Sequence, residues 1–90
     1  DDASIIDSLG WAQFKRAKVT EAIATLQSAA AKDPTQAEIR EHLGDALYTA
    51  GFRREARFAW NAALVTAEDE IVPRVKAKLE TGLTAATAAP

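Results

Sequence analysis

The chain has one histidine, and the residues around it are where the sequence could first support chemistry. Glu38, Glu41, His42 and Asp45 follow i, i+3, i+4, i+7 spacing, which would place all four on one face of a helix. Carboxylates and an imidazole at this spacing can bind a cation. A solvated acidic stripe is the commoner meaning of the pattern, and we predict no metal site.

Catalysis has no other support in the sequence. There is no cysteine, no glycine-rich phosphate loop, and no pattern of residues that would orient His42 as a general base. We therefore predict a protein that is not an enzyme and that needs no cofactor. Because the chain has no cysteine, the sequence does not indicate a redox compartment or a cellular location.

Composition and charge narrow the remaining classes. The 90 residues are 48% hydrophobic and carry a formal charge of −2, which fits one small folded domain. The pI near 5.3 argues against nucleic acid as the main partner, because neutralising phosphates needs a basic surface. No apolar stretch approaches the roughly 20 residues that would cross a membrane, so we expect no membrane insertion.

An internal repeat organises the chain. Shifting the sequence by 34 positions aligns eight identical residues without a gap, seven of them small or apolar and one a glutamate. The aligned pairs are Ala3–Ala37, Ile5–Ile39, Leu9–Leu43, Gly10–Gly44, Ala12–Ala46, Glu21–Glu55, Ala22–Ala56 and Ala29–Ala63. The helical elements that must carry these residues come in pairs, one pair per repeat.

Apolar periodicity and chain-breaking residues predict five helices. The first ends near Ala17, and the second ends near residue 32, before Pro34. Thr35 and Glu38 predict a capping box that starts the third helix, and Gly51 suits the left-handed residue that ends it. The fourth runs from about residue 53 to 66, and the fifth follows residues 68–70 with Pro73 in its first turn.

This arrangement resembles the tetratricopeptide repeat (TPR), a helix–turn–helix unit of 34 residues. The resemblance implies an all-α superhelix of two repeats plus a C-terminal capping helix. It also implies positions where helices pack closely, at small residues and at the large residues between units. These repeat-packing positions are Leu9, Gly10, Ala22, Leu26, Ala29, Leu43, Gly44, Ala56, Trp60 and Ala63.

The resemblance also predicts the domain boundaries. We expect a single TPR domain over residues 1–83, with repeat one at about 3–36, repeat two at about 37–70 and the capping helix at about 70–83. Residues 84–90 are expected to be a flexible tail. Since the chain has no methionine, we expect an excised piece. Its tandem motifs, beginning at Asp7, His42 and Glu55, resemble the C-terminal repeats of longer bacterial TPR proteins, which implies the same origin here.

In TPR proteins the first helix of each unit lines a concave groove that holds a partner segment. Carried over by position, the groove residues are Asp7, Trp11, Phe14, Lys15, Glu38, Glu41, Asp45 and Tyr48, with Ser4 and Thr49 at the edges. The carboxylates and aromatics predict a protein or peptide partner that is basic or amphipathic, anchored by the rings. Alternatively, Trp11 packs beneath the neighbouring repeat.

A second interpretation is self-association. Without a polar capping unit before it, the first repeat would expose Ile5, Ile6 and Leu9, which could pack on upstream repeats or form a homodimer. Basic residues also gather near the turns within each repeat. Arg53 and Arg54 there oppose the dipole of the helix they start; a basic rim contact and ordinary solvated turns both fit, and we favour the turns.

Overall fold

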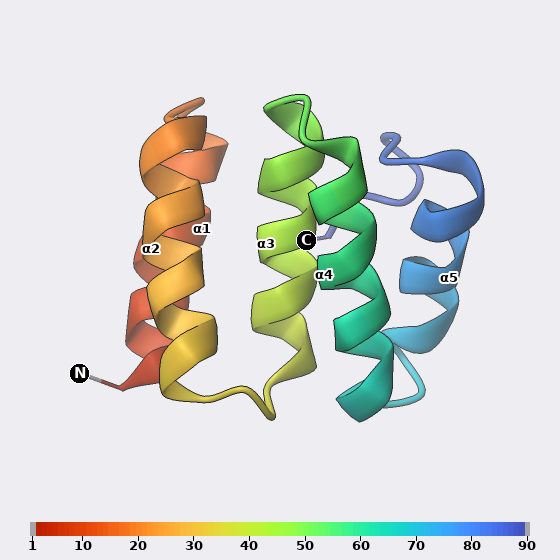
Figure 1. Ribbon diagram of the computed structural model, residues 1–90, viewed down its shortest axis with the longest axis horizontal. Helices are drawn as coiled ribbons and strands as arrows, with labels where there is room; N and C mark the ends of the chain where they lie inside the picture. Colours follow the sequence, from red (N-terminus) through yellow and green to blue (C-terminus); the bar gives the residue numbers. More distant parts are fainter. Residues whose placement is uncertain (1, 90) are drawn as a thin grey trace.

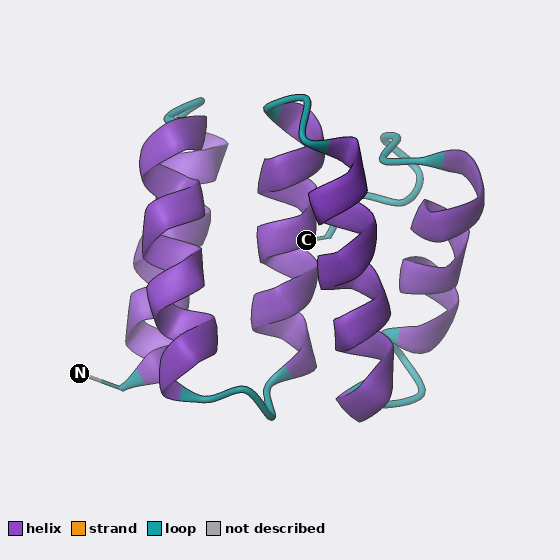
Figure 2. Ribbon diagram, in the orientation of Figure 1, coloured by secondary structure: helices purple, strands orange, loops and turns teal. Residues whose placement is uncertain are grey.

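The computed structural model describes residues 2–89, and within that range it is all-α (Figures 1 and 2). Five helices make up the fold, and no strand occurs in the described part of the chain. They are α1 (Ala3–Lys15), α2 (Val19–Lys32), α3 (Ala37–Thr49), α4 (Arg53–Thr66) and α5 (Val72–Thr81). None of these helices is long and apolar enough to span a membrane. The predicted fold class, all-α, is confirmed.

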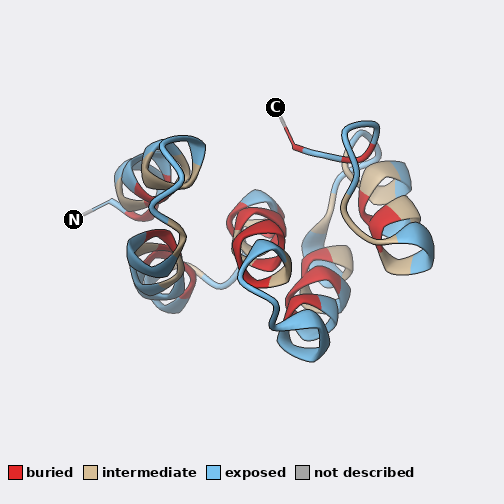
Figure 3. Cartoon of the chain, turned by 90° about the horizontal axis from the view of Figure 1, so that it is seen from above, coloured by how far each residue is buried: buried red, intermediate tan, exposed pale blue. Residues whose placement is uncertain are grey.

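The helices repeat as the sequence does. Both α3 and α4 begin and end 34 positions after α1 and α2, respectively. Each pair is antiparallel, the two pairs stand side by side, and α5 packs beside α4 (Figure 1). Seen from above, α1, α3 and α5 lie toward one side of the molecule, while α2 and α4 lie toward the other (Figure 3). We call the side of α1, α3 and α5 the inner face.

The turn within each helix pair contains a residue in the left-handed backbone conformation. Gly51 has a φ of 95°, and Ala17, the equivalent residue of the first pair, has a φ of 65°. A left-handed residue closes a helix readily when it is glycine, whereas a Cβ makes this conformation costly. The first turn therefore carries backbone strain that the second avoids.

The connection between the pairs differs from its prediction. A capping box would have Thr35 bonding to the amide of Glu38, but the Thr35 hydroxyl and amide both donate to Asp33 Oδ1, at 2.6 and 3.0 Å. The N-cap of α3 is Gln36, whose side-chain amide donates to Asp33 Oδ2. Asp33, next to the helix-ending Pro34, organises the turn, and these hydrogen bonds lower the pKa of its carboxyl.

The close-packing positions lie mostly where helices cross. Ala22, Leu26, Ala29, Ala56, Trp60 and Ala63 are fully buried. A Cβ on Gly10 would lie 2.8 Å from Leu26 Cδ2, and a Cβ on Gly44 would collide with the indole ring of Trp60. Leu43 is half-buried against the core. Leu9 is the exception, because its side chain is 56% exposed and does not serve as a packing residue within this chain.

The end of the chain folds back. Residues 84–89 form a turn in which Thr87 Oγ1 accepts from the Thr84 amide at 2.8 Å, and Thr87 and Ala89 are buried. The two views agree that this segment runs from the end of α5 toward the middle of α3 on the inner face (Figures 1 and 3). Residues 84–89 therefore lie against the helices, the flexibility expected of this segment stays a prediction, and Pro90 lies outside the described residues.

Candidate functional site

Stacked rings join the two helix pairs on the inner face. Trp11 lies parallel to His42 of α3 with ring centroids 4.0 Å apart, and to Phe14 with centroids 4.8 Å apart. His42 Nδ1 lies 2.9 Å from Asp7 Oδ1, and both of these side chains are buried. Since Asp7, Trp11 and Phe14 are three or four residues apart, α1 presents them on one side. The result is a three-ring stack, fixed at its base by a polar contact and half-exposed at Trp11 and Phe14.

Lys15 extends this group. Its ammonium lies 5.3 Å from the centroid of the Trp11 ring, within cation–π distance. Ser4, at the other end of α1, is exposed, and its hydroxyl donates to the side-chain oxygen of Gln36 at 3.1 Å. The structure thus brings together the four groove residues predicted on α1, namely Asp7, Trp11, Phe14 and Lys15. Asp7 is buried and contacts His42, so the accessible part of this group consists of the rings of Trp11 and Phe14 and the ammonium of Lys15.

Glu41 lies on the other side of α3 and faces α5. Its carboxylate accepts two hydrogen bonds from the Arg74 guanidinium, both at 2.6 Å, in a bidentate arrangement. It also accepts from the Lys78 ammonium at 2.7 Å. The side chains of Glu41 and Lys78 are fully buried.

Asp45, one turn further along α3, completes this group. Its carboxylate accepts from Lys78 Nζ at 2.9 and 3.0 Å and from the indole Nε1 of Trp60 at 3.1 Å. We call Glu41, Asp45, Arg74 and Lys78 the charge network. Its two carboxylates and two cations balance when all four are charged, which is the condition under which burying such groups is tolerable.

The two carboxyls of the charge network titrate differently. Burial alone would raise the pKa of Glu41, but the hydrogen bonds and charges of Arg74 and Lys78 together hold it below its usual value. Burial raises the pKa of Asp45 above its usual value, although Lys78 and Trp60 favour its charged form. The bidentate bond to Glu41 raises the pKa of Arg74. At Glu41, three hydrogen bonds from two cations therefore outweigh burial, whereas at Asp45 the bonds from one cation, Lys78, and from the Trp60 indole do not.

These contacts correct the predicted groove on α3. Glu41 and Asp45 were expected to be open to a basic partner, but α5 of the same chain supplies the basic groups and covers them. Tyr48 faces the end of α5, where a Cβ on Gly82 would collide with its hydroxyl, and Arg53 lies over its ring. Of the four α3 residues predicted for the groove, Glu38 alone is exposed.

A signal for α5 was present in the sequence. Arg74 and Lys78 are four residues apart, as are Glu41 and Asp45, so opposite charges with the same helical spacing are available on two helices. The prediction of α5 as an apolar capping helix left out these two cations.

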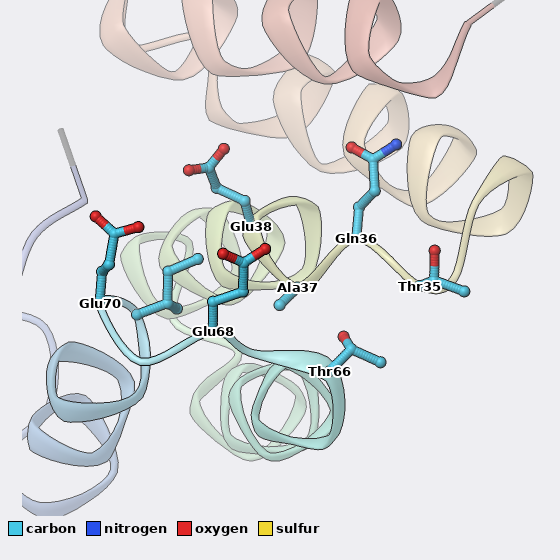
Figure 4. Close-up of a pocket in the computed structure, with 8 residues that line it drawn as sticks. Thr35, Gln36, Ala37, Glu38, Thr66, Glu68 and Glu70 are labelled. Atoms are coloured by element: carbon cyan, nitrogen blue, oxygen red, sulfur yellow. The ribbon is translucent and has the colours of Figure 1, made fainter.

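An open pocket of about 300 Å³ lies where the α2–α3 and α4–α5 connections meet (Figure 4). Glu38, Glu68 and Glu70 contribute its carboxylates, and Thr35 and Thr66 are among its polar walls. Within residues 2–89, no cluster of histidine and acidic side chains is arranged to hold a metal ion. The pocket gives this end of the inner face an acidic margin.

Comparisons with known proteins identify no relative. No family model, curated protein or solved structure matches the chain. Function must therefore be argued from the geometry.

Proposed function

We propose that the chain is a TPR-like protein-interaction module, without enzymatic activity, that binds a segment of a partner protein across α1 and α3. The observation that carries this proposal is the ring stack of Phe14, Trp11 and His42, held in place by Asp7 but half-exposed. Rigid aromatic side chains give large contact area at low entropic cost, which makes them frequent binding anchors.

The charges around the stack indicate the chemistry of the partner. Glu41 and Asp45 are already neutralised by Arg74 and Lys78, so they add no attraction for a ligand. Glu38 is exposed and belongs to the acidic pocket with Glu68 and Glu70. An amphipathic segment fits this surface, with apolar side chains on Trp11 and Phe14 and a basic residue toward Glu38.

The test is a peptide selection followed by calorimetry. Peptides selected from a random display library against the full chain are titrated into the wild type and into Trp11→Ala, with Phe58→Ala as the matched control. Phe58 is an exposed aromatic on α4, whose helix lies away from the inner face. We expect Trp11→Ala to weaken binding by about tenfold or more, as for an interface hot spot, and the control to leave it unchanged. Selected peptides that bind Trp11→Ala as tightly as the wild type would refute the proposal.

A second candidate function is packing against another helical repeat or a second copy of the chain. In the second pair, Ile39 packs with Ala29 and Ala30 of α2. Ile5, its equivalent on α1, is 68% exposed, and Leu9 next to it is also exposed. Sedimentation equilibrium at several concentrations tests this: association that Leu9→Lys abolishes supports it, and a monomer at every concentration speaks against pairing of copies.

A further inference from the structure

Arg53 and Arg57 lie at a cavity of about 290 Å³ between the C-terminal end of α3, the start of α4 and the end of α5. Tyr48, Thr81 and Gly82 form other parts of its wall. We call this the arginine cavity. It is separate from the ring stack, and nothing in the binding surface proposed above uses its two guanidinium groups.

Both guanidinium groups are held in position. The Arg53 guanidinium carbon lies 4.6 Å from the centroid of the Tyr48 ring. Arg57 Nη1 donates to the backbone oxygen of Leu79 at 2.8 Å, which ties α4 to α5. A guanidinium that is already oriented loses less entropy when it binds an anion.

Neither arginine has an acidic partner among residues 2–89. The other cation of the wall, Lys78, is already paired with Glu41 and Asp45, so these carboxylates are engaged by Lys78. Two like charges four residues apart on a helix repel each other, and Arg53 in the first turn of α4 also opposes the helix dipole. The arrangement is unfavourable by itself, and a bound anion would relieve all of these repulsions.

We infer that the arginine cavity binds the phosphate group of a small phosphate monoester or of a phosphorylated side chain. A phosphate monoester carries about −1.5 to −2 charges at neutral pH, which matches two unpaired arginines, whereas a carboxylate would neutralise only one. Its oxygens suit the planar fork of a guanidinium, and Tyr48 adds a phenol hydroxyl to the same wall, whereas the Thr81 hydroxyl already donates to the Ala77 backbone oxygen. The cavity volume accommodates a phosphate with a small attached group.

The experiment is a two-dimensional NMR titration of the full chain with inorganic phosphate, at constant pH and with ionic strength balanced by chloride. We expect saturable shifts at the Nε–H groups of Arg53 and Arg57 and at the Gly82 amide. Arg53→Gln should weaken binding by about tenfold, the loss of one charge-assisted contact. Arg54→Gln is the matched control, because this exposed neighbour does not line the cavity and should bind like the wild type.

Arg57→Gln is a second variant, but it also removes the hydrogen bond to Leu79, so its fold is checked by the same spectra. Equal losses in Arg53→Gln and Arg54→Gln, equal shifts with chloride, or shifts that never saturate would each overturn the inference. O-phosphoserine and a phosphoserine flanked by alanines then separate the two sources. Tighter binding of the peptide assigns a phosphorylated side chain, and equal binding assigns a free monoester.

Discussion

The α1–α3 and α3–α5 contacts use the same positions of the repeat in opposite ways. Asp7 and Glu41 are equivalent residues, and so are Trp11 and Asp45. At α1–α3 they make one polar contact to His42 and a ring stack that stays half-exposed. At α3–α5 they make five hydrogen bonds to two cations and are buried. A repeat position that is half-exposed in one unit, at Trp11, is therefore covered by the chain itself in the next, at Asp45.

The strongest way to break this contrast is Lys78→Met, which leaves Glu41 and Asp45 facing each other with Arg74 alone. We expect a loss of about 3–5 kcal/mol in the free energy of unfolding, as when one partner of a buried ion pair is removed. Urea unfolding measures it. Lys76→Met is the control, since Lys76 lies exposed on the same helix. A Lys78 variant as stable as the control would mean that the charge network adds nothing to the α3–α5 contact.

Glu41→Gln tests the charge network through pH. At neutral pH we expect a cost of about 1.5–3 kcal/mol, the range for hydrogen bonds to a charged group. The pKa of Glu41 is lower in the folded chain than its ordinary 4.5, so below that pH the unfolded chain takes up the proton more readily and wild-type stability falls. The difference in the free energy of unfolding between wild type and Glu41→Gln should therefore become smaller as the pH drops below about 4.5.

The opposite shift at Asp45 works against this effect. Because its pKa is raised by burial, the folded chain takes up that proton first as the pH falls from neutral, and this favours folding. Unfolding curves of the wild type and of Glu41→Gln from pH 7 to pH 3 check this, with Glu55→Gln as a control at an exposed glutamate of α4. A gap that stays constant with pH would show that the charge on Glu41 is not what stabilises the fold.

The helix crossings give a smaller contrast. Gly44→Ala should cost about 1–3 kcal/mol through overpacking, because the flat Trp60 ring cannot retreat, and this is partly offset by about 1 kcal/mol of helix propensity. Gly10→Ala should cost less, since the Leu26 side chain can change rotamer. The substitution Trp60→Leu places a leucine opposite Gly44, as Leu26 lies opposite Gly10. In that background Gly44→Ala should cost less stability. Equal costs at both glycines in thermal unfolding would contradict this explanation.

The smallest expected effects lie at the two turns. Ala17→Gly should raise stability by up to about 1 kcal/mol by removing a Cβ from a left-handed residue, less the entropic cost of glycine. Gly51→Ala should lower it by about 1 kcal/mol for the same reason. Because nothing lies within 4 Å of a Cβ at Gly51, the backbone conformation alone decides whether Gly51→Ala raises or lowers the free energy of unfolding. Changes of the same sign in the two variants would refute the strain assigned to Ala17.

The helices could be predicted because their signals are local. Pro34 and Gly51 mark helix ends, and the 34-residue spacing places each helix of the second pair from the first. The small residues at helix crossings follow from the same alignment. The turn at Asp33 was mispredicted as a capping box because Thr35 suits both arrangements. Whether its hydroxyl accepts from the Glu38 amide or donates to Asp33 depends on how the chain places these groups in three dimensions.

The candidate site could be predicted only in part. The α1 residues lie on one side of a single helix, so spacing alone groups them. The α3 residues were assigned to an open groove because their partners, Arg74 and Lys78, lie 33 to 37 positions away on a helix whose docking no local pattern fixes. The burial of Thr87 and Ala89 was missed for a related reason, since alanine and threonine carry no strong signal for burial.

The two tryptophans are built-in optical reporters of the two contacts. Trp60 is fully buried against the charge network, so its fluorescence should lie at shorter wavelength and respond to the loosening of α5. Trp11 is half-exposed and stacked on His42, so its emission should lie at longer wavelength and respond to anything that settles on the inner face. One emission spectrum can therefore separate a ligand that only covers the face from one that opens the fold.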